Sequence, residues 1–487
     1  MRPRAGYWVL ALFVLADLVY SFIQNYQLPL DGDLAAIVMP GPGYSRVLQD
    51  PFGWAAFTQN AHYGAPNRYF AHALLSGYFR HVPLWLQAFL PPIDSVYAAA
   101  ALFKTLTQAL LLYVLVQYSK PLTASQGYAR YWLAAALYVP LFQGAGFNGQ
   151  MGIIDHSITY TCFYAFPLLL LLCWLLPYFR AAVGGAASRF TKLQVAGLGL
   201  LAIVLAFNGP VIPGAMVVLG VLILTYASYH LSSGGTVAAI VSRLGGRRGV
   251  GLLLFFGLLC LYSLYIGRNN SENPLDGPGL WERYKLLPQG VFYQVTGKLG
   301  LPLLLLFCLL NDQLLKRLLP GHPAARRLRI VLRWAGWFAL GYVLLLPQGG
   351  YRVYRPYLLR RDTVLPIILA LVAFYGVSSY YLLTYLPARA KAWYTGAVVV
   401  FGGIFMNADK IRLSENNTCE RAALQQLAGS QAPVEHLQSN CTIMAWQPIT
   451  DANASGLNAQ LLQHWRVTGQ QVLYDQVTPS GQVFQGQ

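Results

Sequence analysis

Two aspartates near the N-terminus are the first residues of this sequence whose types and spacing could do chemistry. Asp31 and Asp33 flank Gly32 in the stretch LPLDGDLAAI, directly after the first long apolar run. A carboxylate at the mouth of a cavity can take a proton from a hydroxyl group as a general base, or can bind a divalent cation. Two acids this close also raise one pKa through mutual repulsion. The alternative is structural, because Asp-Gly is a common turn dipeptide and Asp33 could cap a helix beginning at Leu34.

A short loop rich in arginine is the strongest local anomaly. The stretch PQGGYRVYRPYLLRRDT contains Arg352, Arg355, Arg360 and Arg361, together with tyrosines such as Tyr351. A guanidinium group matches phosphate with parallel hydrogen bonds, and tyrosine suits the headgroup level of a membrane. The loop therefore favours binding of a lipid-linked phosphate or pyrophosphate. The alternatives are plain headgroup binding and, for the neighbouring acid in RRDT, simple charge balance.

Two further polar groups are candidate contacts to a substrate. His62, Arg68 and His72 lie in AHYGAPNRYFAHA, and Asp155 with His156 lies in FNGQMGIIDHSITY at an expected helix end. As alternatives, the first group would be interfacial polar residues and the second would cap a helix.

The elements that must position these residues are helices in a membrane. The chain has 487 residues, of which 56% are hydrophobic and 10% charged, with a mean hydropathy of +0.45. Apolar runs of about 20 residues can cross a bilayer as helices. We expect about eleven such spans, near residues 7–24, 95–117, 129–147, 159–178, 193–208, 211–229, 250–267, 299–315, 330–347, 364–386 and 394–407. Asp17 and Lys104 lie inside expected spans, where ionisable groups are costly, and one hypothesis is that they pair.

The net charge of +17 is distributed unevenly between the two predicted sides of the membrane. With the N-terminus inside, the inner segments carry the entire positive excess and a single acid, Asp312. This is the positive-inside pattern of a membrane protein and excludes a nucleic-acid-binding patch as the origin of the charge. The first apolar run lacks a small-residue cleavage site and is expected to remain as a helix. The pattern predicts a cytoplasmic N-terminus and an outer C-terminus.

The cysteines agree with this orientation. Cys419 and Cys441 are the two cysteines in a polar segment, and that segment is predicted to lie outside, so a disulfide between them is expected. The spacings lack CxxC or His-rich metal motifs.

Residues 1–407 are expected to form the membrane domain, and residues 408–487 a small outer α+β domain. The large first outer loop, residues 24–92, is rich in aromatics and predicts helices lying in the interface plane. In the C-terminal domain we expect a helix near 419–428 and strands at CTIMAW and QQVLYDQV.

The predicted architecture resembles that of the C-type glycosyltransferase superfamily. The shared features are an acidic residue directly after the first span, interfacial helices in a large first outer loop, about eleven spans and an outer C-terminal domain. Members take a sugar from a polyprenyl-phosphate carrier and attach it to a glycan, lipid or protein outside the membrane. The resemblance implies that Asp31 or Asp33 holds the position of the catalytic acid of this family, and that the four arginines hold the carrier phosphate. The chain has neither the Asp-Glu pair of the mannosyl and aminoarabinose branches nor the WWDYG-like motif of oligosaccharyltransferases.

The sequence thus predicts an α-helical polytopic membrane glycosyltransferase for hexosyl or pentosyl transfer, in a bacterial inner membrane with a periplasmic C-terminus. Its partners would be membrane lipids, a polyprenyl-phosphate-linked sugar and the acceptor, with a divalent cation as an optional cofactor at Asp31 and Asp33. A transporter or flippase of lipid-linked sugars is the competing class, and a glycan polymerase or ligase is the third. Inverted repeats and broken helices, which favour a transporter, are not evident in the sequence.

Overall fold

The computed structural model describes residues 3–122, 128–184, 190–273, 277–410 and 416–477. Almost all of its regular structure is helical. The elements, in chain order, are α1 (Pro3–Tyr26), α2 (Leu34–Val38), α3 (Pro42–Gln49), α4 (Trp54–Thr58), α5 (Tyr69–Leu86), α6 (Pro92–Ser119), η1 (Lys120–Leu122), α7 (Tyr128–Tyr138), η2 (Val139–Leu141), α8 (Asn148–Met151), α9 (Ile158–Tyr160), η3 (Thr161–Ala165), α10 (Phe166–Gly184), α11 (Lys192–Ala206), α12 (Val211–Ser232), α13 (Val237–Arg243), α14 (Gly246–Gly267), α15 (Leu280–Thr296), α16 (Gly300–Leu318), α17 (Pro323–Leu345), η4 (Leu346–Gly349), α18 (Arg361–Tyr385), α19 (Ala388–Ala408), α20 (Thr418–Gly429), β1 (Val434–Gln438), η6 (Ala452–Ser455), α21 (Gly456–His464) and β2 (Leu473–Val477).

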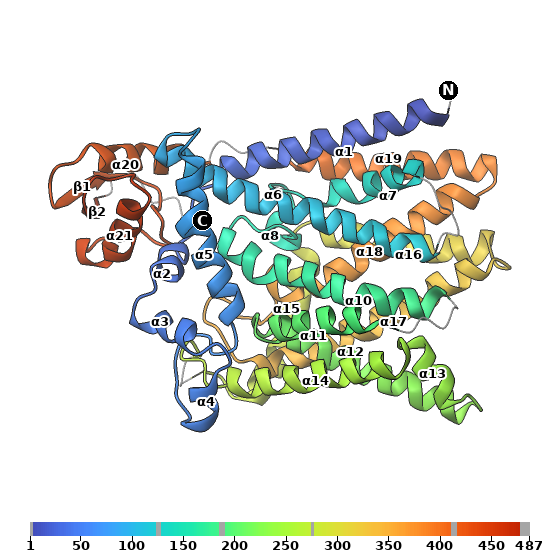
Figure 1. Cartoon of the computed structure of the whole chain (residues 1–487). Coiled ribbons are helices and arrows are strands. Elements are labelled where there is room, and N and C mark those ends of the chain that lie inside the picture. Colours follow the sequence, from blue (N-terminus) through green and yellow to red (C-terminus); the bar gives the residue numbers. More distant parts are fainter. Residues whose placement is uncertain (1–2, 123–127, 185–189, 274–276, 411–415, 478–487) are drawn as a thin grey trace.

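Long apolar helices run side by side and form the body of the molecule (Figure 1). Seven helices in the described ranges are long and apolar enough to cross a membrane. An eighth is possible if α15 and α16, which meet at an angle of 84°, count as one bent span. The predicted class, a helical membrane protein, is therefore confirmed.

Seven of the predicted spans coincide with these long helices. The other four fall on α7, α11, α16 and α19. Helix α7 is short because Pro140 follows it in η2 and the chain then turns, with Gly146 at a φ of 55°. Helix α11 is short because the turn at Asn208, Gly209 and Pro210 follows it. The count of eleven spans stays a prediction.

The pairing hypothesis for Asp17 and Lys104 is wrong. The Lys104 ammonium donates a hydrogen bond to the backbone carbonyl of His156, and its charged neighbours are Asp155 and Asp31. The charged neighbour of Asp17 is Asp409. Lys104 thus faces the segments that carry the candidate acids.

The C-terminal elements gather at one end of the bundle, beside α2 and α5, while α1 begins at the other end (Figure 1). The disulfide between Cys419 and Cys441 is present, and α20 confirms the expected helix. Strands β1 and β2 pair in parallel, with Val434 opposite Leu473.

Of the two expected C-terminal strands, the second contains β2, but a strand at 441–446 is wrong. This stretch turns, with Met444 at a φ of 48°, and buries Ile443 and Met444. Such a positive φ interrupts the extended backbone of a strand. The first strand lies instead at β1, and α21 was not expected.

The buried carboxylate of Glu420 links the C-terminal segment to residues 24–92 by hydrogen bonds. It accepts hydrogen bonds from the backbone N–H of Leu30 at 2.9 Å, from the Tyr97 hydroxyl at 2.7 Å and from the backbone N–H of Met444 at 2.9 Å. A second contact is the indole N–H of Trp465, which donates to the carbonyl of Phe79 at 2.8 Å. The two segments therefore pack as one body.

Gly32 marks the closest approach between these segments. A Cβ atom on Gly32 would lie 2.4 Å from the backbone nitrogen of Trp446 and 2.8 Å from the carbonyl carbon of Ala445. Since Gly32 does not have a positive φ, it is this close approach that requires a glycine between the two aspartates.

We expect Gly32→Ala to weaken this docking by about 1–3 kcal/mol, since the added methyl group meets backbone rather than a movable side chain. Limited proteolysis of the purified protein should cleave the C-terminal segment faster. Gly77→Ala is the matched control, because a Cβ at Gly77 meets nothing within 4 Å. Equal cleavage rates for the two variants would contradict this account of Gly32.

Candidate functional site

A cavity of about 820 Å³ lies where the end of α1, the 145–164 segment, the start of α18 and the C-terminal segment meet. It brings together most of the residues that the sequence singled out. Those that line it are Asp31, Asp33, Arg68, His72, Asp155, His156, Arg352, Arg360 and Arg361. The candidate acids and three of the four loop arginines therefore share one space, although they are more than 300 residues apart in sequence.

Asp31 is a structural node of this cavity. Its carboxylate is 2% exposed and accepts four hydrogen bonds: from the Ser157 hydroxyl at 2.8 Å, from the Thr159 hydroxyl at 2.9 Å, from the Thr159 backbone at 3.0 Å and from the Asp33 backbone at 3.1 Å. Each oxygen thus has two donors, and no free lone pair is left to take a proton from a substrate.

Asp33 is the available acid of the pair. Among the residues that the structure describes, the one hydrogen bond to its side chain comes from the indole N–H of Trp446, at 2.9 Å. It does not cap α2 with its side chain, so that alternative is wrong. Burial and the neighbouring charge of Asp31 raise the pKa of Asp33 to about 6, against the lowering effect of the Trp446 hydrogen bond. A carboxyl group with this pKa is suited to accept a proton near neutral pH.

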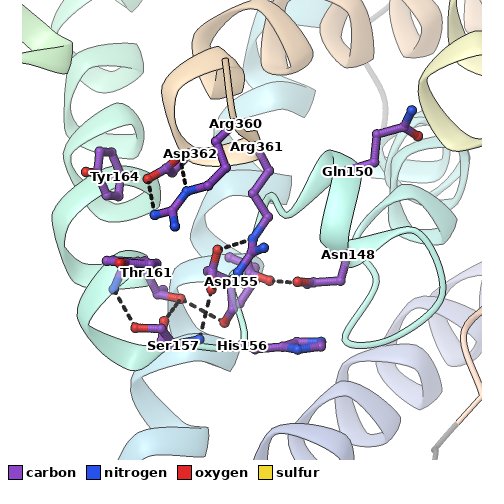
Figure 2. A network of polar contacts seen from close by, with 12 residues as sticks. Asn148, Gln150, Asp155, His156, Ser157, Thr161, Tyr164, Arg360, Arg361 and Asp362 are labelled. Atoms are coloured by element: carbon purple, nitrogen blue, oxygen red, sulfur yellow. Dashed lines mark hydrogen bonds and ion pairs between the residues drawn. The ribbon is translucent and has the colours of Figure 1, made fainter. Parts of the chain in front are cut away.

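The loop arginines are neutralised by buried acids (Figure 2). Asp362 accepts hydrogen bonds from Arg355 at 2.6 Å and from Arg360 at 2.7 and 3.0 Å. Arg361 donates two hydrogen bonds to the Asp155 carboxylate, at 2.6 and 3.1 Å. The carboxylates hold the guanidinium groups in place while Arg360 and Arg361 still line the cavity.

A further ion pair, between Arg352 and Glu272, lies on another wall of the cavity. Arg352 contacts Glu272 at 3.4 Å and also hydrogen-bonds the Asn273 side chain. The Tyr44 hydroxyl donates to Glu272 at 2.6 Å. Burial opposes ionisation of Glu272, but the charge of Arg68 and this hydrogen bond outweigh it and hold its pKa below the usual range.

Arg68 differs from the other cavity arginines because its side chain makes no hydrogen bond or direct ion pair among the described residues, although the nearby charge of Glu272 stabilises its charged form. Its guanidinium lies over the Phe163 ring, 4.9 Å from the centroid, and its buried Nε lacks an acceptor. Next to it, burial and Arg68 lower the pKa of His72 to about 3, so this imidazole is neutral. A partly buried cation that makes no direct ion pair favours an anionic ligand.

Three predicted residues do not line the cavity. His62 is exposed on the surface, and Tyr351 lies outside the lining. Arg355 lies behind the wall, where it holds Asp362 and the Tyr164 hydroxyl. Their assignment as substrate contacts stays a prediction that this geometry does not support.

Several lining residues were missed from the sequence: Tyr44, Tyr160, Glu272, Lys298 and Trp446. Glu272 and Lys298 stand in loops without a motif, and nothing in CTIMAW indicates a long-range contact. The one signal that could have found Glu272 and Lys298 is that each is a charged residue on the predicted outer face.

The aspartate pair does not fit a divalent cation. All lone pairs of Asp31 are occupied by protein donors, and Asp33 alone remains. Across the described ranges, no group of three or more His, Cys, Asp or Glu side chains could hold a metal ion.

Compared with protein-family models and with curated proteins, the sequence matches none.

Asp31→Ala should lower the stability of the protein by about 3 kcal/mol or more, because it leaves several buried donors unsatisfied. Asp33→Ala removes one hydrogen bond and should cost about 1 kcal/mol. Thermal unfolding of both variants, followed by tryptophan fluorescence in the same detergent, compares them directly. A larger loss for Asp33→Ala than for Asp31→Ala would reverse the roles assigned here.

Proposed function

We propose that this protein is an integral-membrane glycosyltransferase that moves a hexose or pentose from a polyprenyl-phosphate carrier to an acceptor on the outer face of a bacterial inner membrane. The acceptor is a glycan, a lipid or a protein. One observation carries the proposal: a single cavity joins a carboxyl group of pKa about 6, Asp33, to Arg68, a guanidinium that makes no direct ion pair among the described residues.

The proposed step is one displacement at the anomeric carbon. The Asp33 carboxylate takes the proton of the acceptor hydroxyl as that oxygen bonds to the anomeric carbon. The bond from this carbon to the phosphate oxygen breaks, and the carrier leaves as its phosphate. Arg68 and Arg360 stabilise the negative charge that develops on the phosphate, in a cavity partly shielded from water.

The topology we propose has eleven spans, with the N-terminus inside and the C-terminus in the periplasm. In its support, α7, α11, α16 and α19 run along the same bundle as the seven long helices (Figure 1). The C-terminal elements and the start of α1 lie at opposite ends of that bundle. The positive-inside distribution of charge gives the direction.

A transporter of lipid-linked sugars remains the competing class, since it would use the same arginines. A transporter could use Asp33 as a proton carrier. A transferase needs a base in the same cavity as the phosphate-binding arginines, and because Asp33 and these arginines line one cavity, we favour an enzyme. A polymerase or ligase would use the same base and is separated by its product, which would carry a whole glycan.

Asp33→Asn should reduce sugar transfer about 10²–10⁴-fold, the usual contribution of a general base. The assay follows release of undecaprenyl phosphate from a panel of undecaprenyl-phosphate hexoses and pentoses, with the full-length protein in proteoliposomes that contain bacterial membrane extract as acceptor source. Glu282→Gln is the matched control, because Glu282 is an exposed acid paired with Lys285 outside the cavity.

Transfer at the wild-type rate by Asp33→Asn would exclude Asp33 as the base. Movement of the lipid-linked sugars across the bilayer without release of undecaprenyl phosphate would exclude the transferase and support the transporter.

The pH dependence gives an independent test. Since the base acts only when ionised, kcat/KM should rise about tenfold per pH unit below pH 6 and level off above it. A profile that is flat between pH 4.5 and 7 in a protein that stays folded would contradict the assignment of Asp33.

A further inference from the structure

Trp446 stands beside the proposed base in an unusual setting. It comes from the C-terminal segment, 413 positions after Asp33 in sequence, and donates its indole N–H to that carboxylate. The side chain is 40% exposed although it lines the cavity. A large aromatic ring left open on a cavity wall is the surface that ligand sites commonly use.

The ring does not stand alone. Trp446 stacks on Tyr160, with ring centroids 5.7 Å apart and an interplanar angle of 21°. Arg360 lies over Tyr160 at 4.8 Å from the centroid. The order along the wall is therefore Arg360, Tyr160, Trp446 and Asp33, a row that begins with a phosphate-binding group and ends with the base.

The backbone holds Trp446 firmly in this place. Glu420 binds the N–H of Met444, and the Asn458 amide donates to the Met444 carbonyl at 3.2 Å. Gly32 admits the chain at residues 445–446, and the disulfide at Cys441 fixes the start of the stretch.

We propose that Tyr160 and Trp446 form the subsite for the transferred sugar ring, so that the disulfide-bonded C-terminal segment takes part in sugar recognition. This inference rests on the proposed function. A sugar ring has an apolar C–H face that packs on an aromatic ring, and hydroxyl groups at its edge that hydrogen-bond to neighbouring polar groups. With the carrier phosphate at Arg360, such a ring packs on the exposed surface of Trp446, which Tyr160 supports by stacking, and presents its anomeric carbon toward an acceptor held by Asp33.

The test compares binding of bare undecaprenyl phosphate with binding of undecaprenyl phosphate that carries a single hexose, N-acetylhexosamine or pentose. The full-length protein is used in lipid nanodiscs. The wild type should bind at least one sugar-bearing carrier more tightly than the bare one. Trp446→Ala should lower the affinity for that sugar-bearing carrier about tenfold, which is the scale of one aromatic contact. The affinity for bare undecaprenyl phosphate should stay within about twofold of the wild-type value.

Trp281→Ala is the matched control, since Trp281 is 71% exposed on α15 and lies outside the cavity lining. Trp446→Phe should retain most of the binding but move the acid limb of the kcat/KM profile to higher pH, because it removes the hydrogen bond that lowers the pKa of Asp33. A role in packing alone would not produce that shift.

Equal weakening of bare and sugar-bearing carriers by Trp446→Ala, or no weakening of either, would overturn the sugar subsite. A wild type that binds the bare carrier as tightly as every sugar-bearing one would overturn it as well, with the proposed function still standing. Failure of the wild type to bind any of these carriers would remove the proposed function and the subsite together.

Discussion

The hydrogen-bonded carboxylate of Asp31 is the interaction on which the site depends. A buried carboxylate is costly unless donors satisfy it, and here donors from Ser157, Thr159 and the backbone of Asp33 fill all four positions. These contacts tie the first outer loop to the start of α9. They also fix the peptide of Asp33, whose side chain is left as the free acid of the cavity.

Charge neutralisation is the second constraint. The loop arginines would be unfavourable together on a partly dry wall, and Asp362, Asp155 and Glu272 each hold at least one of them. The acids neutralise the site and orient its donors in advance, so that little reorganisation is needed when an anion binds. Arg68 makes no such direct ion pair among the described residues, and the charge of a bound phosphate would complement it.

Much of the fold and part of the site could be predicted from the sequence. Hydropathy locates the long helices, and one cysteine pair in a polar segment is enough to predict the disulfide. Sorting charges by side predicts that Asp31, Asp33 and the loop arginines lie on one face, and the two acids and three of the four arginines do share a cavity. The different roles of Asp31 and Asp33 could not be predicted, because they depend on which of the two carboxylates accepts hydrogen bonds from Ser157 and Thr159.

Other features arise from contacts that leave no local pattern. The approach of Trp446 to Asp33 depends on docking of the C-terminal segment through Glu420, and no periodicity reports such a contact. The strand expected at 441–446 fails for the same reason, since the turn at Met444 serves that docking. Glu272, in an Asn-rich turn, carries no motif that would distinguish it from a solvated acid.

The central claim is that one cavity holds the carrier phosphate on its arginines and the reacting sugar against Asp33. A cryo-electron microscopy structure of Asp33→Asn with a bound undecaprenyl-phosphate sugar tests it most directly. The account predicts phosphate density within hydrogen-bond distance of Arg68 or Arg360, and sugar density between that phosphate and residue 33. A carrier phosphate bound outside the cavity, with the arginines still engaged only by their carboxylates, would contradict it.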